Sequence, residues 1–199
     1  MKRIIYRILY CIGTVVFRLW HPVFRVSGRE HILSDRNMLI CANHSGLADP
    51  CWILLAMNLR DFPRIMAKAS LMKIPLFSGL IRYLGVFGVR RGESDVTAFK
   101  TALKALKDGE NLLLFPEGTR VRPGKTVTAK SGAAVLALRT DTPILPVYLE
   151  RKRYPFSPMR CVFGESFFLP QEDRKAPTEI MRQHAAEIMR RVYALGETS

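Results

Sequence analysis

The stretch NHSGLADP, residues 43–50, places His44 and Asp49 in one turn between two apolar segments. Ionisable groups between buried segments cost free energy unless they are paired or used. An imidazole titrates near neutral pH and can act as a general base, while a carboxylate can fix its tautomer and stabilise its charged form. One interpretation is therefore a base and its orienting partner, set to take a proton from a hydroxyl.

A purely structural interpretation also fits Asp49. An aspartate directly before a proline, here Pro50, is a typical helix start, in which the carboxylate caps free backbone N–H groups. This interpretation leaves His44 unexplained. The two interpretations are compatible, because a capping aspartate can still hold an imidazole with its other oxygen.

A second polar turn is FPEGTR, residues 115–120. Proline at its second position and glycine at its fourth predict a type I turn, which accounts for neither Glu117 nor Thr119 nor Arg120. Backbone N–H groups, a hydroxyl and a guanidinium are the groups that bind a phosphate. The turn is therefore a candidate phosphate site.

Both turns follow segments that the sequence predicts to be buried strands, at Asn37–Ala42 and 111–115, and a buried helix is predicted at 50–57. Continuous apolar strands alternating with helices predict an α/β fold, with a mainly parallel sheet covered by helices on both faces. In such sheets ligands bind at the carboxyl ends of the strands, so we expect both turns on one rim. Further elements are expected as helices at about 96–109 (with Ser94 as N-cap), 131–138 and 180–192, and as strands at about 144–149 and 159–163.

The charge of the chain predicts an anionic partner. At 199 residues the chain can form one sizeable core, its apolar content of 48% excludes disorder, and its formal charge is +14. Residues 1–28 and 62–92 contain no acid, and their basic residues alternate with large aliphatic ones. This pattern favours an anionic lipid surface over a nucleic acid, for which basic residues among polar ones are more typical.

The first twenty residues predict an amphipathic helix. Its uncharged, mainly apolar run at 8–17 is too short for the roughly 20 residues that span a bilayer, and no small-residue cleavage site of a signal peptide follows it. We therefore expect residues 1–22 to lie in a membrane interface with Trp20 at headgroup level, followed by one catalytic domain at 23–199. The alternative is a helix packed on the core of the protein itself. The expected polar face holds Arg3, Arg7, Cys11, Thr14 and Arg18, and the apolar face Ile5, Ile8, Leu9, Ile12, Val16 and Leu19.

Cysteine and histidine spacings predict neither a disulfide frame nor a metal site. The four cysteines form no Cys-x-x-Cys pair and are expected as reduced, mostly core residues of a protein on the cytosolic side. A metal bound by His44 and Asp49 would need a third ligand, and the other histidines lie at no recognisable ligand spacing. These cysteines are Cys11, Cys41, Cys51 and Cys161, and the other histidines are His21, His31 and His184.

Four motifs, in order, resemble those of the glycerophospholipid acyltransferase family, and within it the bacterial 1-acylglycerol-3-phosphate acyltransferases. They are His44-x4-Asp49, Gly85–Arg91, FPEGTR at 115–120 and Leu145–Val147. His-x4-Asp alone is a weak signature, but followed by FPEGTR it is a strong one. Arg90 departs from the family pattern, since many members carry an acid there.

The resemblance implies transfer of a fatty acyl group from acyl-CoA or acyl-acyl carrier protein to the sn-2 hydroxyl of lysophosphatidate, giving phosphatidic acid without a cofactor. His44 would be the general base and Asp49 its orienting partner. The acceptor phosphate would be bound by Arg91, Glu117, Gly118, Thr119 and Arg120, although Glu117 could instead bind glycerol hydroxyls or orient an arginine. The expected partners are an anionic membrane surface, the lysophospholipid and the acyl donor, but no nucleic acid. The expected location is the cytoplasmic face of the cell membrane, as a peripheral or monotopic protein.

Other functions remain open at this point. The acceptor could be another lysophospholipid or glycerol-3-phosphate. A thioesterase or lipid hydrolase could use the same His–Asp pair with water as acceptor, and would release the acyl group without any lysolipid. A non-catalytic module that binds anionic membranes would show no turnover and would tolerate replacement of His44.

Overall fold

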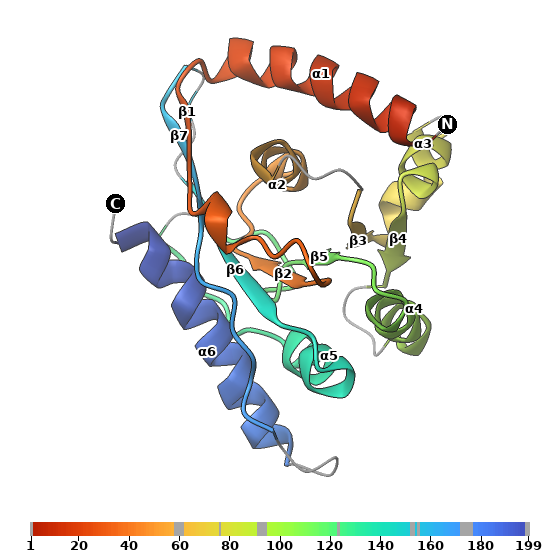
Figure 1. The fold of residues 1–199 in the computed structure, drawn as a ribbon, viewed down its shortest axis with the longest axis vertical. Coiled ribbons are helices and arrows are strands. Elements are labelled where there is room, and N and C mark those ends of the chain that lie inside the picture. The colour runs from red at the N-terminus through yellow and green to blue at the C-terminus, as the bar shows by residue number, and fades with distance from the viewer. Residues whose placement is uncertain are drawn as a thin grey trace.

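The computed structural model of the chain describes residues 2–57, 62–75, 77–90, 95–122, 124–151, 154, 156–171 and 177–197. At its centre lies a seven-stranded sheet in the order β1-β7-β6-β2-β5-β3-β4 (Figure 1). Neighbouring strands are parallel except for β6 and β7, so the predicted mainly parallel sheet is confirmed. The strands are β1 (Phe24–Ser27), β2 (Leu39–Ala42), β3 (Arg64–Lys68), β4 (Val86–Val89), β5 (Leu112–Leu114), β6 (Ile144–Leu149) and β7 (Met159–Phe163).

Helices cover both faces of the sheet, as predicted (Figure 1). On one face lie α1 (Lys2–Trp20) and α2 (Asp49–Met57), and on the other lie α4 (Val96–Lys107), α5 (Gly132–Thr140) and α6 (Thr178–Glu197). The short helix α3 (Phe77–Tyr83) lies near β4 at the edge of the sheet, and two 3₁₀ turns occur at Arg29–His31 and Ala69–Lys73.

The central strands are buried on both faces because their side chains are apolar at successive positions. In β2, Ile40 and Ala42 pack into the core beneath α2, whereas Leu39 and Cys41 pack into the core beneath α4, α5 and α6. This alternation follows from the two-residue period of a strand. Each fully buried aliphatic side chain contributes roughly 1.5–3 kcal/mol, so this strand is firmly placed and the turn after it starts from a fixed point.

The structure differs from the sequence predictions in several details. Strands β1, β3 and β4 and helix α3 were not predicted. Helix α4 begins at Val96 with Asp95 as its N-cap, whose side chain accepts a hydrogen bond of 3.0 Å from the backbone N–H of Ala98. The prediction of Ser94 as the cap was therefore wrong, and Ser94 lies outside the described residues. Of the cysteines expected mostly in the core, Cys41 and Cys161 are buried but Cys11 and Cys51 are exposed.

Helix α1 forms where the N-terminal helix was predicted and lies across α2 (Figure 1). Its two predicted faces are not separated in the structure: Thr14, expected on the polar face, is half-buried, whereas Ile8 and Ile12 of the apolar face are exposed beside Arg7 and Cys11. Its inner side contacts α2 through Tyr10, whose hydroxyl donates to the Leu55 carbonyl at 3.1 Å, and through Phe17, whose ring meets Trp52 edge-on at 4.4 Å between centroids. None of the helices in the described parts of the chain combines the length and apolarity needed to cross a bilayer. The outer side of α1 exposes a row of large apolar side chains, which we call the apolar row: Ile4, Ile8, Ile12, Val15, Val16 and Leu19.

Candidate active site

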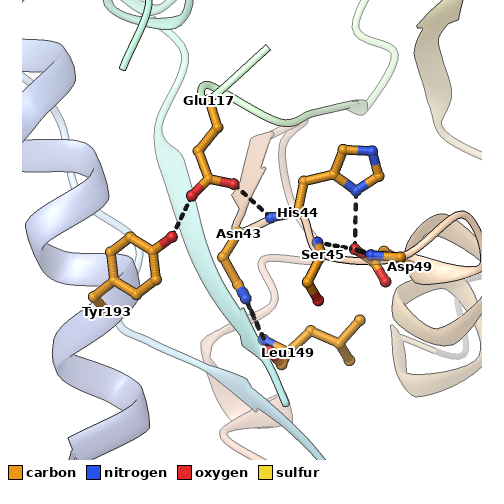
Figure 2. A network of polar contacts seen from close by, with 8 residues as sticks. Asn43, His44, Ser45, Asp49, Glu117, Leu149 and Tyr193 are labelled. Atoms are coloured by element: carbon orange, nitrogen blue, oxygen red, sulfur yellow. Dashed lines mark hydrogen bonds and ion pairs between the residues drawn. The ribbon is translucent and has the colours of Figure 1, made fainter. Parts of the chain in front are cut away.

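The NHSGLADP turn leaves the sheet at the carboxyl end of β2, between β5 and β6, and enters α2. Asn43 fixes the point of departure. Its side-chain amide donates to the Leu149 carbonyl at 2.9 Å and accepts from the Leu149 N–H at 2.8 Å, as Figure 2 shows. The buried amide thus continues the β2–β6 pairing after the backbone has left the sheet.

Asp49 holds the turn together from within. The side chain is fully buried, and its Oδ2 accepts hydrogen bonds from His44 Nδ1 at 2.9 Å, from the Ser45 N–H at 2.7 Å and from the Gly46 N–H at 2.9 Å. A buried carboxylate persists only with such partners. The Ser45 and Gly46 N–H groups belong to the turn before α2. The Oδ2 atom of Asp49 therefore fixes the backbone of the turn and the imidazole of His44 at the same time. The capping interpretation alone does not account for this geometry.

The imidazole of His44 is held in one orientation by its contact with Asp49. A carboxylate only accepts hydrogen bonds, so Nδ1 carries the hydrogen toward Asp49; in the neutral imidazole the lone pair then lies on Nε2. Figure 2 shows Nε2 on the side of the ring away from Asp49. The ring stacks on Phe115 at 4.2 Å between centroids with 20° between the planes, and the residue is 7% exposed. The predicted contact between His44 and Asp49 is therefore present, and it occupies Nδ1 and not Nε2.

Glu117 has a different place from the one predicted. It is 2% exposed, its Oε2 accepts from the His44 N–H at 2.8 Å, and its Oε1 accepts from the Tyr193 hydroxyl of α6 (Figure 2). Burial, followed by the hydrogen bond and the charge of Glu117, raises the pKa of the Tyr193 phenol. A buried carboxylate with both oxygens engaged is not placed to bind a phosphate, so that expectation for Glu117 was wrong. Its contacts connect the backbone of His44 to α6.

The FPEGTR turn lies against the same rim of the sheet. The Gly118 N–H donates to the Phe115 carbonyl at 2.9 Å and closes the turn, and the Val121 N–H donates to the His44 carbonyl at 2.7 Å. Thr119 and Arg120 are exposed. The two turns therefore meet as predicted, with Arg120 one residue from a backbone contact to His44. Arg91, the other predicted phosphate ligand, lies outside the described residues.

Gly118 allows a basic side chain to pass close to the turn. Its φ is 65°, in the left-handed region that favours glycine, and a Cβ at this position would come within 2.8 Å of Lys130 Cε. The aliphatic stem of Lys130 thus lies over Gly118, and the backbone N–H of Lys130 donates to the Pro116 carbonyl at 2.8 Å. Lys130 adds a positive charge near the turn that the sequence did not predict.

A mainly apolar cavity of about 190 Å³ opens beside this turn. Its walls include Met66, Leu114, Phe115 and Leu136, and Arg90 and Lys130 also line it. Phe115 thus contributes both to the cavity and to the stack on His44. Within the described parts of the chain, histidine, cysteine and acidic side chains nowhere form a group of three or more that could hold a metal ion.

Sequence reasoning missed two polar residues of this network. Asn43 stood inside the quoted motif, but its partner Leu149 is 106 residues away, so no local pattern announces the contact. Tyr193 is 76 residues from Glu117 and looks like any other residue of an amphipathic helix. Only the fold brings these partners together.

Comparison with known proteins identifies relatives of the chain. It is 36% identical over 126 residues to the 1-acyl-sn-glycerol-3-phosphate acyltransferase of Borreliella burgdorferi, an alignment that covers 62% of this chain and 50% of the relative. It is 27% identical over 177 residues to the enzyme of the same name from Bacillus subtilis, covering 82% of this chain and 87% of the relative. The chain thus spans half of the first relative and most of the second.

The fold has a solved counterpart as well. The crystal structure of the 1-acyl-sn-glycerophosphate acyltransferase of Thermotoga maritima superposes on this chain with a TM-score of 0.74 at 28% sequence identity. The matched region covers 98% of this chain and 81% of the T. maritima chain. The model of the acyltransferase family matches residues 23–150, which is more than half of the sequence and includes both polar turns. The chain belongs to the acyltransferase family.

Proposed function

We propose that this chain transfers a fatty acyl group from an acyl thioester to the sn-2 hydroxyl of 1-acylglycerol-3-phosphate. The observation that supports this most directly is the buried His44–Asp49 pair, at 2.9 Å, on the same rim as the exposed Arg120. A base that activates a hydroxyl and a guanidinium that binds a phosphate suit an acceptor bearing both groups. The names of the B. burgdorferi, B. subtilis and T. maritima relatives agree with this acceptor.

In the proposed mechanism the acceptor hydroxyl attacks the thioester carbonyl carbon as Nε2 of His44 takes its proton. The new C–O bond gives a tetrahedral intermediate, which collapses by breaking the C–S bond, and the proton held by His44 passes to the leaving sulfur. The products are phosphatidic acid and a free thiol. A positioned base of this kind contributes about 10²–10⁴ in rate. Asp49 fixes the tautomer and stabilises the imidazolium.

The acceptor phosphate would be bound at the FPEGTR turn. Arg120 and Thr119 are exposed there and supply a guanidinium and a hydroxyl. Gly118 lets the side chain of Lys130 pass close to the turn, where it adds a positive charge. We place Arg91 in the same role from its position in the motif. The apolar cavity beside Phe115 suits a hydrocarbon chain of the acceptor or the donor. Either acyl-CoA or acyl-acyl carrier protein could be the donor.

The substrate and product are membrane lipids, so we propose that α1 binds the membrane surface as a peripheral or monotopic anchor. Its outer side presents the apolar row, and the exposed Arg7 and Arg18 stand beside that row. An amphipathic helix with this distribution lies in the interface, where basic residues contribute about 1 kcal/mol each on anionic lipid. We place the protein at the cytoplasmic face of the cell membrane, because its cysteines are free.

The test is a turnover assay with both donors and a panel of acceptors: lysophosphatidate, lysophosphatidylcholine, glycerol-3-phosphate and none. Labelled acyl lipid and released thiol are measured together. The proposal predicts equal amounts of both products, with lysophosphatidate as the preferred acceptor. Thiol release at the same rate without an acceptor would instead identify a thioesterase, and a preference for lysophosphatidylcholine would identify a different acyltransferase.

A further inference from the structure

Three aromatic side chains are exposed near the end of α1: Trp20 at 60%, Tyr154 at 71% and Phe156 at 72%. We call them the aromatic cluster. Trp20 ends α1, whereas Tyr154 and Phe156 lie on the connection between β6 and β7, more than a hundred residues further along the chain. In Figure 1 this connection reaches the level of α1 beside the start of β1.

The connection is tied to the end of α1 by hydrogen bonds. The Phe156 N–H donates to the Trp20 carbonyl at 2.9 Å, and the Met159 N–H donates to the Val23 carbonyl at 2.8 Å. The ring of the buried His21 is hydrogen-bonded through Nδ1 to the Ser157 carbonyl at 2.8 Å. The backbones of Trp20 and Phe156 are therefore held side by side, and the Ser157 hydroxyl, which donates to the Tyr154 carbonyl at 2.7 Å, ties Tyr154 to the same connection.

The conformation of Phe156 is costly for an isolated protein. Its φ is 66°, in the left-handed region that residues with a side chain seldom adopt, and its ring gains little from burial within the chain. Large apolar side chains gathered on a surface mark a contact with something outside the chain. The strain is offset if the phenyl ring is buried there.

The surroundings indicate what that partner is. Leu19, the last residue of the apolar row, directly precedes Trp20 of the aromatic cluster. The exposed Arg7, Arg18 and Arg25 lie in the same segment, residues 1–28, which contains no acid. Tryptophan and tyrosine are enriched at headgroup level, since their rings are apolar and their N–H or O–H can meet water. Apolar, aromatic and positively charged groups together complement an anionic lipid surface.

We propose that Tyr154 and Phe156 form a second membrane contact, which enters the lipid interface beside Trp20. The inference rests on the proposed role of α1 as the first contact. A single interfacial helix can roll about its own axis, whereas a second contact from another part of the chain prevents rolling. The connection between β6 and β7 thereby determines how the catalytic domain faces the membrane.

The first experiment measures partition of the whole protein into phosphatidylcholine vesicles containing phosphatidylglycerol. Phe156→Gly removes the ring and keeps a residue that readily adopts φ of 66°. Phe168→Ala is the matched control: it removes an exposed phenyl next to Phe167, which bridges to Ile144 at the opposite end of β6. We expect Phe156→Gly to weaken partition about tenfold and the control to leave it unchanged. Turnover on detergent-dispersed substrate should be the same in both, so this result is independent of whether acyl transfer is confirmed.

A second readout reports the depth of the ring. Trp20 and Trp52 are the two tryptophans of the chain, and Trp52 is buried. In a Trp20→Phe background, the Phe156→Trp variant has two tryptophans, the introduced one and the buried Trp52. Brominated lipids should quench its fluorescence more strongly than that of the Trp20→Phe protein, in which only Trp52 emits. Equal partition of Phe156→Gly and the control, or an unquenched reporter, would overturn the proposal. So would a dimer in solution that Phe156→Gly dissociates while vesicle binding stays the same.

Discussion

Replacement of Asp49 by asparagine separates the catalytic role of this residue from its structural one. Asp49 Oδ2 lies 2.9 Å from His44 Nδ1, which places the charge centres of a carboxylate and an imidazolium roughly 4 Å apart. With an effective dielectric constant of about 20, their attraction is about 4 kcal/mol. A neutral amide loses this attraction when the imidazolium forms, so we expect Asp49→Asn to lower kcat about 10³-fold.

The same substitution should leave the fold nearly intact. The amide oxygen of asparagine can still accept from the Ser45 and Gly46 N–H groups, and a neutral acceptor contributes about 1 kcal/mol less than a charged one. For a chain of this size that corresponds to a fall in Tm of about 2–4 °C. A circular dichroism melt measures this loss, and the lysophosphatidate assay at saturating donor measures kcat.

The control is Asp108→Asn, the same chemical change at an exposed carboxylate paired with Lys104 at the far end of α4. It should change neither kcat nor Tm appreciably, because exposed ion pairs contribute little. If Asp49→Asn keeps the wild-type kcat while Asp49→Ala only unfolds the protein, Asp49 serves the turn alone and the proposed pair is not catalytic.

Four further predictions follow from the described contacts. His44→Ala should fold and bind vesicles normally but lower kcat by about 10²–10⁴, and an unchanged kcat would exclude it as the base. Arg120→Lys keeps the charge but loses the planar fork, so kcat/KM should fall about ten- to a hundredfold with lysophosphatidate and less with lysophosphatidylcholine; equal losses would contradict phosphate selection. The pKa of the Tyr193 phenol is raised in the folded protein, so its contribution to the free energy of unfolding is complete below the ordinary pKa of about 10 and is lost as the pH rises beyond it. Tyr193→Phe leaves Glu117 one hydrogen-bond partner short and should lower the stability near neutral pH. In melts at a series of pH values, the variant should also lose less stability than the wild type as the pH rises above about 10. Deletion of residues 1–20 should strongly weaken vesicle binding and retain some turnover in detergent, whereas equal partition of the two proteins would exclude α1 as the anchor.

The central elements were predicted well because a strand buried on both faces consists almost entirely of apolar residues. The strand before His44, the strand before Phe115 and the strand at 144–149 are continuous apolar runs. Strands β3 and β4 were missed for the opposite reason. They lie toward one edge of the sheet, where β4 is only half-buried throughout. The lysines and arginines of the surrounding segment, residues 62–92, gave it the appearance of a lipid-facing surface.

The site was predicted to the extent that it is local. His44 and Asp49 lie within one turn, so their spacing alone indicates a contact. Glu117 was assigned to the substrate because it shares the FPEGTR motif with Thr119 and Arg120, which are exposed, and nothing within a few residues reveals its burial. A side chain whose partners lie on distant elements is placed by tertiary packing, which a single sequence does not encode in any short pattern.

The pairing of β1 with β7 has a consequence for how the protein is made. Phe24 lies beside Met159 in this parallel pair, so the edge of the sheet next to α1 closes only after most of the chain has left the ribosome. Such distant pairings slow folding, because a long loop must be ordered before any contact compensates for it. During that interval α1 and its apolar row are already synthesised. If α1 reaches the bilayer first, the catalytic domain completes its folding while tethered to a lipid surface, and the rate of refolding in vitro should then depend on whether vesicles are present.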